Sequence, residues 1–212
     1  MQLISQNPTD KDFIQNPYKF YKNFVSSDCL YFWHEYNMPA VFDYAGQEIL
    51  FKDNRFGREK LKNQSKENEK HLIDFNNLEK NSMLELEPPK HTRLRGLVLR
   101  AFTTRKINTL QPEIVALSHK LLDDLRSDNV DILKEFATLL PVIVIARLLG
   151  VPETMAGNLL SWSNDMVMMY QARRTRELEI QANSSTKEFV SFMEKYIEEK
   201  RYKPEDDLIS HL

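Results

Sequence analysis

His91 and Arg95 are the residues of this sequence whose type and spacing point most directly to a binding function. They follow Glu87-Pro88-Pro89. Proline favours the start of a helix, because its φ is preset and its missing N–H would be unpaired there in any case. Residues four apart on a helix lie on the same face, one turn from each other. The spacing therefore predicts a helix from about Lys90 that presents hydrogen-bond donors on one face.

The opposite face of this helix is predicted to be apolar, and the segment as a whole is basic. Between Glu87 and Glu113 there is no acidic residue, and such a segment creates a local positive field. From the residues alone the simplest interpretation is a solvated helix face, and a short basic cluster without a recognised nucleic-acid-binding fold argues against a nucleic-acid partner. The basic residues are Lys90, Arg93, Arg95, Arg100, Arg105 and Lys106, and the apolar ones at helical spacing are Leu94, Leu97, Val98 and Phe102.

Length and composition are those of a globular protein. The 212 residues suffice for one domain or for part of a larger one, and 42% of them are hydrophobic. With 29 basic and 31 acidic residues the net charge is only -2, which provides no general attraction to nucleic acid. The first residues have neither a basic start nor an apolar run, so we expect a cytoplasmic protein without a membrane anchor.

Sequence motifs for other chemistries are missing. The five glycines form neither a dinucleotide fingerprint nor a phosphate-binding loop. No Gly-x-Ser-x-Gly marks a serine nucleophile. The histidines are not spaced as metal ligands usually are. Cys29 is the only cysteine, so the chain can form neither an internal disulfide nor a metal site with several thiolate ligands. Local motifs therefore predict no catalytic residue and no metal ligand.

The N-terminal part carries the only clear sheet signal. Two aromatic and β-branched runs, 29–33 and 40–44, flank Asn37-Met38-Pro39, and this order predicts an antiparallel hairpin. Residues 58–81 are rich in Lys, Glu, Asn and Gln, so we expect a connecting segment there. The helices expected in this part of the chain are at 16–25, 46–52 and 70–75.

Beyond Pro88 the pattern is helical almost throughout. Leucines and isoleucines recur every three or four residues from Leu110 to Leu125, which indicates an amphipathic helix. The segment 140–149 is apolar nearly all round and ends at Gly150, so we expect a buried helix there. The predicted fold class is mainly α, with a small antiparallel hairpin near the N-terminus. Three more helices are predicted. One follows Pro152 and one starts at Pro204. The helix between them has an inward face made of Phe189, Phe192, Met193, Tyr196 and Ile197.

The order of these segments resembles the soluble bacterial branch of the cytochrome P-450 superfamily, the heme-thiolate monooxygenases. The run Glu-Pro-Pro-Lys-His-Thr-Arg-Leu-Arg at 87–95 is similar to the family segment that contains its His-x-x-x-Arg pair. The resemblance covers nearly the whole chain and implies that residues 1–212 form the N-terminal part of a single P-450-like domain. Five further segments agree in the family's order: Asn16-Pro17-Tyr18, Asp53-Asn54-Arg55-Phe56, Ala101-Phe102-Thr103-Thr104-Arg105, Leu148-Leu149-Gly150-Val151-Pro152 and Asp206-Asp207-Leu208-Ile209-Ser210.

The resemblance implies a heme cofactor and assigns roles to several residues. In the family the His and Arg of the pair hydrogen-bond the heme propionates, and these positions correspond to His91 and Arg95. A guanidinium can hold a carboxylate with two charge-assisted hydrogen bonds. The family's surface around this basic helix docks an acidic ferredoxin or flavodoxin, for which positive charge steers encounter. The residues implied as contacts of an apolar small-molecule substrate are Met83, Leu84, Met166 and Met169.

The resemblance implies that three elements of the family's chemistry lie after residue 212: the oxygen-activating helix, the Glu-x-x-Arg pair, and the Phe-x-x-Gly-x-x-x-Cys loop that provides the axial thiolate. Cys29 lacks the glycine-rich context of that loop and is expected to be a small buried hydrophobe. The first hypothesis is an N-terminal fragment of a P-450 monooxygenase, truncated before these elements and inactive as this chain alone. The alternative is a non-catalytic helical remnant or interaction module. An exposed apolar surface is expected to promote self-association.

Overall fold

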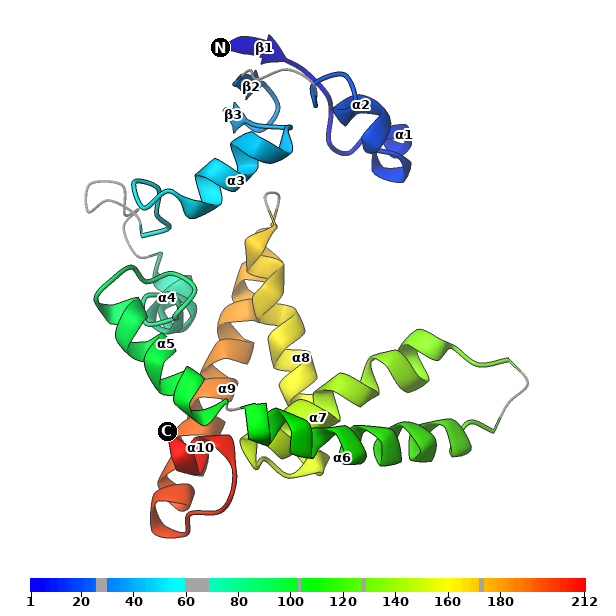
Figure 1. Ribbon diagram of the computed structural model, residues 1–212, viewed down its shortest axis with the longest axis vertical. Coiled ribbons are helices and arrows are strands. Elements are labelled where there is room, and N and C mark those ends of the chain that lie inside the picture. The colour runs from blue at the N-terminus through cyan, green and yellow to red at the C-terminus, as the bar shows by residue number, and fades with distance from the viewer. Residues whose placement is uncertain (26–29, 60–68, 103, 127–128, 172–173) are drawn as a thin grey trace. The chain divides into compact units, whose positions relative to one another are not determined.

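The computed structural model describes residues 1–25, 30–59, 69–102, 104–126, 129–171 and 174–212 of the chain. Cys29 lies outside these ranges, so its predicted burial is not addressed. The chain forms two compact units, Met1–Gly57 and Arg58–Leu212 (Figure 1). The assignment of all 212 residues to one domain stays a prediction. Within the described residues, no helix has the length and apolar character that a membrane-crossing helix needs.

The first unit contains a small sheet with strand order β1-β2-β3, formed by Gln2–Ile4, Tyr31–Trp33 and Met38–Ala40. Strands β2 and β3 are antiparallel, with Trp33 opposite Met38, so the predicted hairpin is confirmed. Its second strand starts earlier than predicted and its turn precedes Met38, with Asn37 at a φ of 51°. The reason lies at Asp43, whose carboxylate accepts from the Gly46 N–H at 2.6 Å and caps a helix. Asp43 and Tyr44, the last two residues of the predicted strand, therefore belong to the start of this helix instead.

Strand β1 pairs in parallel with β2, a contact that the sequence pattern does not predict. Three helices complete this unit: α1 (Lys11–Gln15), α2 (Tyr18–Tyr21) and α3 (Tyr44–Lys52). Helix α1 was not predicted, α2 is shorter than the expected 16–25, and α3 matches the expected 46–52. Aromatic side chains from α1, α2 and the segment after β3 pack around the buried Ile4, Tyr31 and Trp33. The rings meet mostly edge-on, as Phe13 and Trp33 do at a centroid distance of 6.0 Å.

Within the described residues of the second unit, all regular elements are helices. The expected helical stretch at 70–75 is present as η1 and α4, and the helix predicted from Lys90 is α5. The predicted amphipathic helix is α6, which begins before Leu110 and ends before Leu125. The elements in chain order are η1 (Lys70–Leu72), α4 (Ile73–Glu79), α5 (Lys90–Ala101), α6 (Thr104–Asp123), the π-helix η2 (Leu133–Ala137), α7 (Leu139–Leu149), η3 (Glu153–Met155), α8 (Ala156–Val167), η4 (Met168–Tyr170), α9 (Arg176–Tyr202) and α10 (Leu208–His211).

Helices α8 and α9 lie side by side and form the centre of this unit (Figure 1). Trp162 of α8 is buried between them, and its Nε1 donates to Glu188 Oε2 at 3.0 Å. Phe189, Phe192 and Tyr196 of α9 pack against the same cluster, which confirms most of the predicted inward face of this helix. Ile197, which was placed on that face, is 38% exposed.

The segment 140–149 was expected to form a buried helix, but only part of the surface of α7 is buried. Val142 and Ala146 are buried against α8, whereas Ile145 is 52% exposed. Helices α6, α8 and α10 contact α7 on part of its circumference. An apolar composition alone does not specify which sides of a helix find a neighbour.

The end of α7 is a tightly packed corner. Gly150 adopts a φ of 76°, the left-handed conformation with which helices commonly end. A side chain at this position would meet Asp207, since an added Cβ lies 2.5 Å from Asp207 Cγ. Asp207 in turn lies 2.7 Å from the Nζ of Lys200, a buried lysine of α9 that also contacts Glu205 at 2.6 Å. Burial alone would lower the pKa of Lys200, but its hydrogen bonds to Asp207 and Glu205 raise this pKa above its ordinary value.

Candidate functional site

The candidate site is the basic face of α5, and the local sequence explains where this helix starts. Pro89 occupies the N-cap position, and the carbonyl oxygens of Glu87 and Pro89 accept from the N–H groups of His91 and Arg93, both at 3.1 Å. The helix therefore begins at Lys90, as predicted. It ends at Ala101, and no residue between these ends is buried.

His91 and Arg95 lie one turn apart on this helix, His91 half-buried and Arg95 exposed. Within the described part of the chain, neither side chain has a hydrogen bond or an ion pair. The same holds for the exposed Arg93 and Arg100. Helix α5 therefore presents several cationic or donor groups that no carboxylate of the described chain neutralises.

The two acidic residues that precede α5 most closely in the sequence, Glu85 and Glu87, both contact Arg58. Arg58 donates through its guanidinium to Glu85 Oε1 at 2.6 Å, and its backbone N–H donates to Glu87 Oε1 at 2.6 Å. Both carboxylates therefore already have a partner in Arg58. Because a bound carboxylate group would find free donors at His91 and Arg95, the chemistry of this pair fits an acidic ligand. Arg105 and Lys106, the last members of the predicted basic segment, have side chains outside the described set.

The four residues predicted to contact substrate lie in two different surroundings. Met83 is half-buried and Leu84 is 62% exposed in the turn before α5. Met169 is buried in η4 and belongs to a cluster with Leu72, Phe75 and Ala182, and Met166 packs against this cluster and against that of Trp162. The two methionines fill space between helices, as flexible methionine side chains commonly do. A role for the four residues in substrate binding stays a prediction.

A polar contact between α4 and α9 had no signal in the sequence. Asn183 Oδ1 accepts from the N–H groups of Asp74 at 2.9 Å and Phe75 at 3.1 Å, and its Nδ2 donates to Asp74 Oδ2 at 3.0 Å. Asn183 thereby binds two free N–H groups in the first turn of α4 from a position about a hundred residues further along the chain. This contact holds the segment before Met83 and Leu84 against α9.

Comparisons with known proteins identify the architecture. No protein-family model matches the chain. The polyketide biosynthesis cytochrome P450 PksS of Bacillus subtilis is 34% identical over 100% of this chain and 53% of the relative. A biotin biosynthesis cytochrome P450 of the same organism is 27% identical over 99% of the chain and 53% of the relative. The chain thus spans about half the length of the curated relatives it matches.

Solved structures agree with these relatives. P450BioI, in complex with acyl carrier protein ligated to hexadec-9Z-enoic acid, has a TM-score of 0.86 and 27% identity over 95% of this chain and 53% of that one. PksS has a TM-score of 0.76 and 31% identity over 97% of this chain and 51% of that one. Fold and sequence define a mainly α protein that is similar to bacterial cytochrome P450s. The chain belongs to the cytochrome P450 superfamily, and it has the architecture of the N-terminal half of these proteins.

Proposed function

We propose that this chain forms the propionate-binding half of a heme site in a cytochrome P450 monooxygenase. The observation that carries the proposal is the pair on α5, His91 and Arg95, which share a helix face and have no partner among the described residues. Two propionates would supply the negative charges that this face lacks. A bound heme would supply the iron chemistry of dioxygen activation, and its thiolate ligand would come from a part of the P450 fold that these 212 residues do not span.

Arg95 is the stronger of the two proposed heme contacts. Its guanidinium can donate two parallel charge-assisted hydrogen bonds to one carboxylate, whereas a neutral imidazole donates one. His91 is half-buried and lies nearer to the helix start, where the partial positive charge of the helix also favours an anion. The proposed role of both residues is to orient the cofactor: their hydrogen bonds to the propionates would fix the position of that edge of the heme.

The substrate proposed for the complete enzyme is an apolar small molecule. The names of the relatives support an acyl-type compound, since one refers to polyketide biosynthesis and one structure contains an acyl carrier protein with a hexadecenoic acid. Met83 and Leu84 lie in the turn between α4, which Asn183 anchors, and α5, and would be the more accessible contacts. The remaining exposed cations, among them Arg93 and Arg100, would attract an acidic ferredoxin or flavodoxin.

The test measures heme retention in a completed fold, in which the chain is fused to the matching remainder of PksS. Arg95→Ala should weaken heme retention by about 1.5 to 3 kcal/mol, the usual contribution of a hydrogen bond to a charged group. His91→Ala should cost less. Arg93→Ala is the control, because Arg93 is also an exposed arginine of α5 but lies on a different face. If Arg93→Ala loses as much heme as Arg95→Ala, the face is only a solvated basic surface.

A second measurement concerns the chain by itself, which we propose to be inactive. Reduced chain mixed with heme and carbon monoxide should not produce the red-shifted Soret band of thiolate ligation, because Cys29 is its only thiol and lacks the ligand-loop context. A band that appears and is lost in Cys29→Ala would overturn this part of the proposal and show that the isolated chain ligates heme iron.

A further inference from the structure

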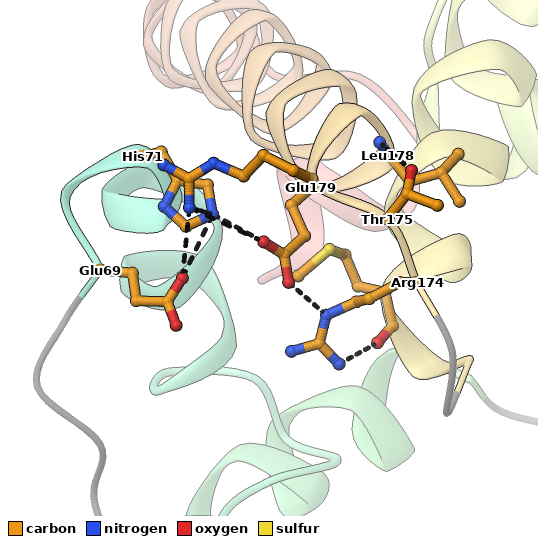
Figure 2. Close-up of polar contacts among 8 residues, drawn as sticks. Glu69, His71, Arg174, Thr175, Leu178 and Glu179 are labelled. Carbon is orange, nitrogen blue, oxygen red and sulfur yellow. Dashed lines mark hydrogen bonds and ion pairs between the residues drawn. The ribbon is translucent and has the colours of Figure 1, made fainter.

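Three ligand-type side chains converge where η1 meets the start of α9. His71 Nε2 lies 2.8 Å from Glu179 Oε2 and 3.3 Å from Glu69 Oε2, and the three atoms all lie within 4.8 Å of one another (Figure 2). His71 and Glu179 are largely buried, with 11% and 15% of their side chains exposed, while Glu69 is half exposed. The cluster is separate from the basic face of α5 and contains none of its residues.

The hydrogen bonds of His71 cannot all be satisfied at once. Arg176 places its Nη1 2.8 Å from His71 Nε2, the same nitrogen that approaches Glu179 Oε2 at 2.8 Å. If Nε2 carries a proton it donates to Glu179, and the contact with Arg176 then joins two donors. If Nε2 is unprotonated it accepts from Arg176, and the contact with Glu179 then joins two acceptors. One of the two contacts is therefore unfavourable in either protonation state.

A single cation bound to all three atoms would remove this conflict. The cationic Arg176 Nη1 already lies near all three ligand atoms, 2.8 Å from His71 Nε2, 3.5 Å from Glu69 Oε2 and 4.0 Å from Glu179 Oε2. Its side chain is 58% exposed and can move into solvent. A dication in its place would face an imidazole lone pair and two carboxylates. Tetrahedral Zn²⁺ with ligand bonds of about 2.1 Å separates neighbouring ligand atoms by about 3.4 Å. In this cluster His71 Nε2 lies 3.3 Å from Glu69 Oε2 and 2.8 Å from Glu179 Oε2, and all three atoms lie within 4.8 Å of one another, so a small shift of Glu179 would suffice.

The neighbouring residues hold Glu179 in the orientation that such a site needs. Arg174 donates through Nε to Glu179 Oε1 at 2.8 Å (Figure 2). Its Nη1 donates to the carbonyl of Met169 at 3.3 Å. Oε1 is thereby occupied, and Oε2 is the oxygen that faces His71. Outer contacts that orient a ligand in this way are typical of metal centres.

We propose that Glu69, His71 and Glu179 form a binding site for a divalent transition metal ion, with Zn²⁺ as the reference ion. Mixed imidazole and carboxylate ligands favour such an ion over Mg²⁺ or Ca²⁺, which prefer oxygen ligands only. Three protein ligands leave one position for water. Because His71 precedes α4 and Glu179 belongs to α9, the bound ion would tie these helices together beside the Asn183 contact.

The test is calorimetric titration of the intact chain with Zn²⁺, together with thermal unfolding in the presence and absence of the ion. One equivalent should bind and raise the melting temperature. Glu69→Gln and His71→Gln should each weaken binding by more than about tenfold and abolish the thermal shift. Glu69→Gln is the safer variant, because this residue is half exposed and lies outside the helices. Arg176→Ala should bind Zn²⁺ more tightly than the unaltered chain, since it removes the competing cation.

The matched control is His34→Gln, which removes an exposed histidine of the other unit and should leave Zn²⁺ binding unchanged. Circular dichroism establishes that each variant is folded. Absence of stoichiometric binding in both the unaltered chain and Arg176→Ala would overturn the proposal, and the cluster would then be an ion-pair network only. Binding that persists in Glu69→Gln and His71→Gln would overturn it as well.

Discussion

Replacing Gly150 by alanine should strongly destabilise the second unit, although it adds only one methyl group. Gly150 ends α7 at a φ of 76°, and an added Cβ would lie 2.5 Å from Cγ and 2.7 Å from Cβ of Asp207, and closer still to its Oδ2. Contacts this short cannot be accommodated without moving Asp207. That residue is buried and is held from two sides, by the Ser210 N–H at 2.8 Å and by Lys200 Nζ at 2.7 Å.

The magnitude follows from two costs. A non-glycine residue in the left-handed conformation costs about 1 to 2 kcal/mol. Displacing Asp207 from Lys200 leaves a buried ammonium with fewer partners, and breaking a buried ion pair typically costs about 3 to 5 kcal/mol. Partial relaxation of the corner reduces the second cost, so we expect a loss of about 3 to 6 kcal/mol in the free energy of unfolding. Domains of this size are stable by only about 5 to 15 kcal/mol, so much of the stability would be lost.

Urea denaturation followed by circular dichroism measures this loss, and Gly157→Ala provides the control. Gly157 lies inside α8 and an added Cβ there meets nothing within 4 Å. Alanine has the higher helix propensity, so Gly157→Ala should be neutral or stabilising by up to about 1 kcal/mol. The two variants add the same methyl group and should act in opposite directions. If Gly150→Ala unfolds within about 0.5 kcal/mol of the unaltered chain, the size of an ordinary surface substitution, the corner does not restrict position 150.

Two further predictions concern side chains that bridge helices. Burial would raise the pKa of Asp207, but hydrogen bonds from Lys200 and Ser210 outweigh burial and keep this pKa below its ordinary value of 3.8. The lowered pKa contributes stability that is fully present above pH 3.8 and is lost as the pH falls from 3.8 through the pKa of the folded state. Asp207→Asn should therefore be less stable than the unaltered chain at neutral pH and should lose less stability on acidification. Denaturation curves at several pH values would contradict this if both proteins lost the same free energy in acid. Asn183→Ala should cost about 0.5 to 2 kcal/mol, the usual range for removing a helix cap, and should speed amide exchange at Asp74 and Phe75. The exposed Asn164 of α8 offers the control Asn164→Ala, and equal exchange rates in the two variants would show that Asn183 does not anchor α4.

Several features of this protein follow from its sequence, because they depend on neighbours within a few residues. Proline at the entry and helical spacing predict α5 and place His91 and Arg95 on one face, and the structure has this helix from Lys90. Gly150 marks the end of α7 for the same local reason, since a left-handed residue terminates a helix regardless of what packs on it. The ordered set of short motifs also identified the superfamily, which the curated and structural relatives confirm.

Other features were decided only by the tertiary structure, because they join residues that are distant in the chain. Strand β1 pairs in parallel with β2. Because β1 has only three residues, Gln2–Ile4, with no clear strand pattern, its sequence does not specify that pairing. The exposed side of α7 depends on which helices pack against it. Its sequence, apolar except for Arg147, does not specify those neighbours. The cluster of Glu69, His71 and Glu179 is the clearest case. Its histidine and its glutamate from α9 are 108 positions apart, so no local spacing could reveal the contact, and only the packing of η1 against α9 brings the three side chains together.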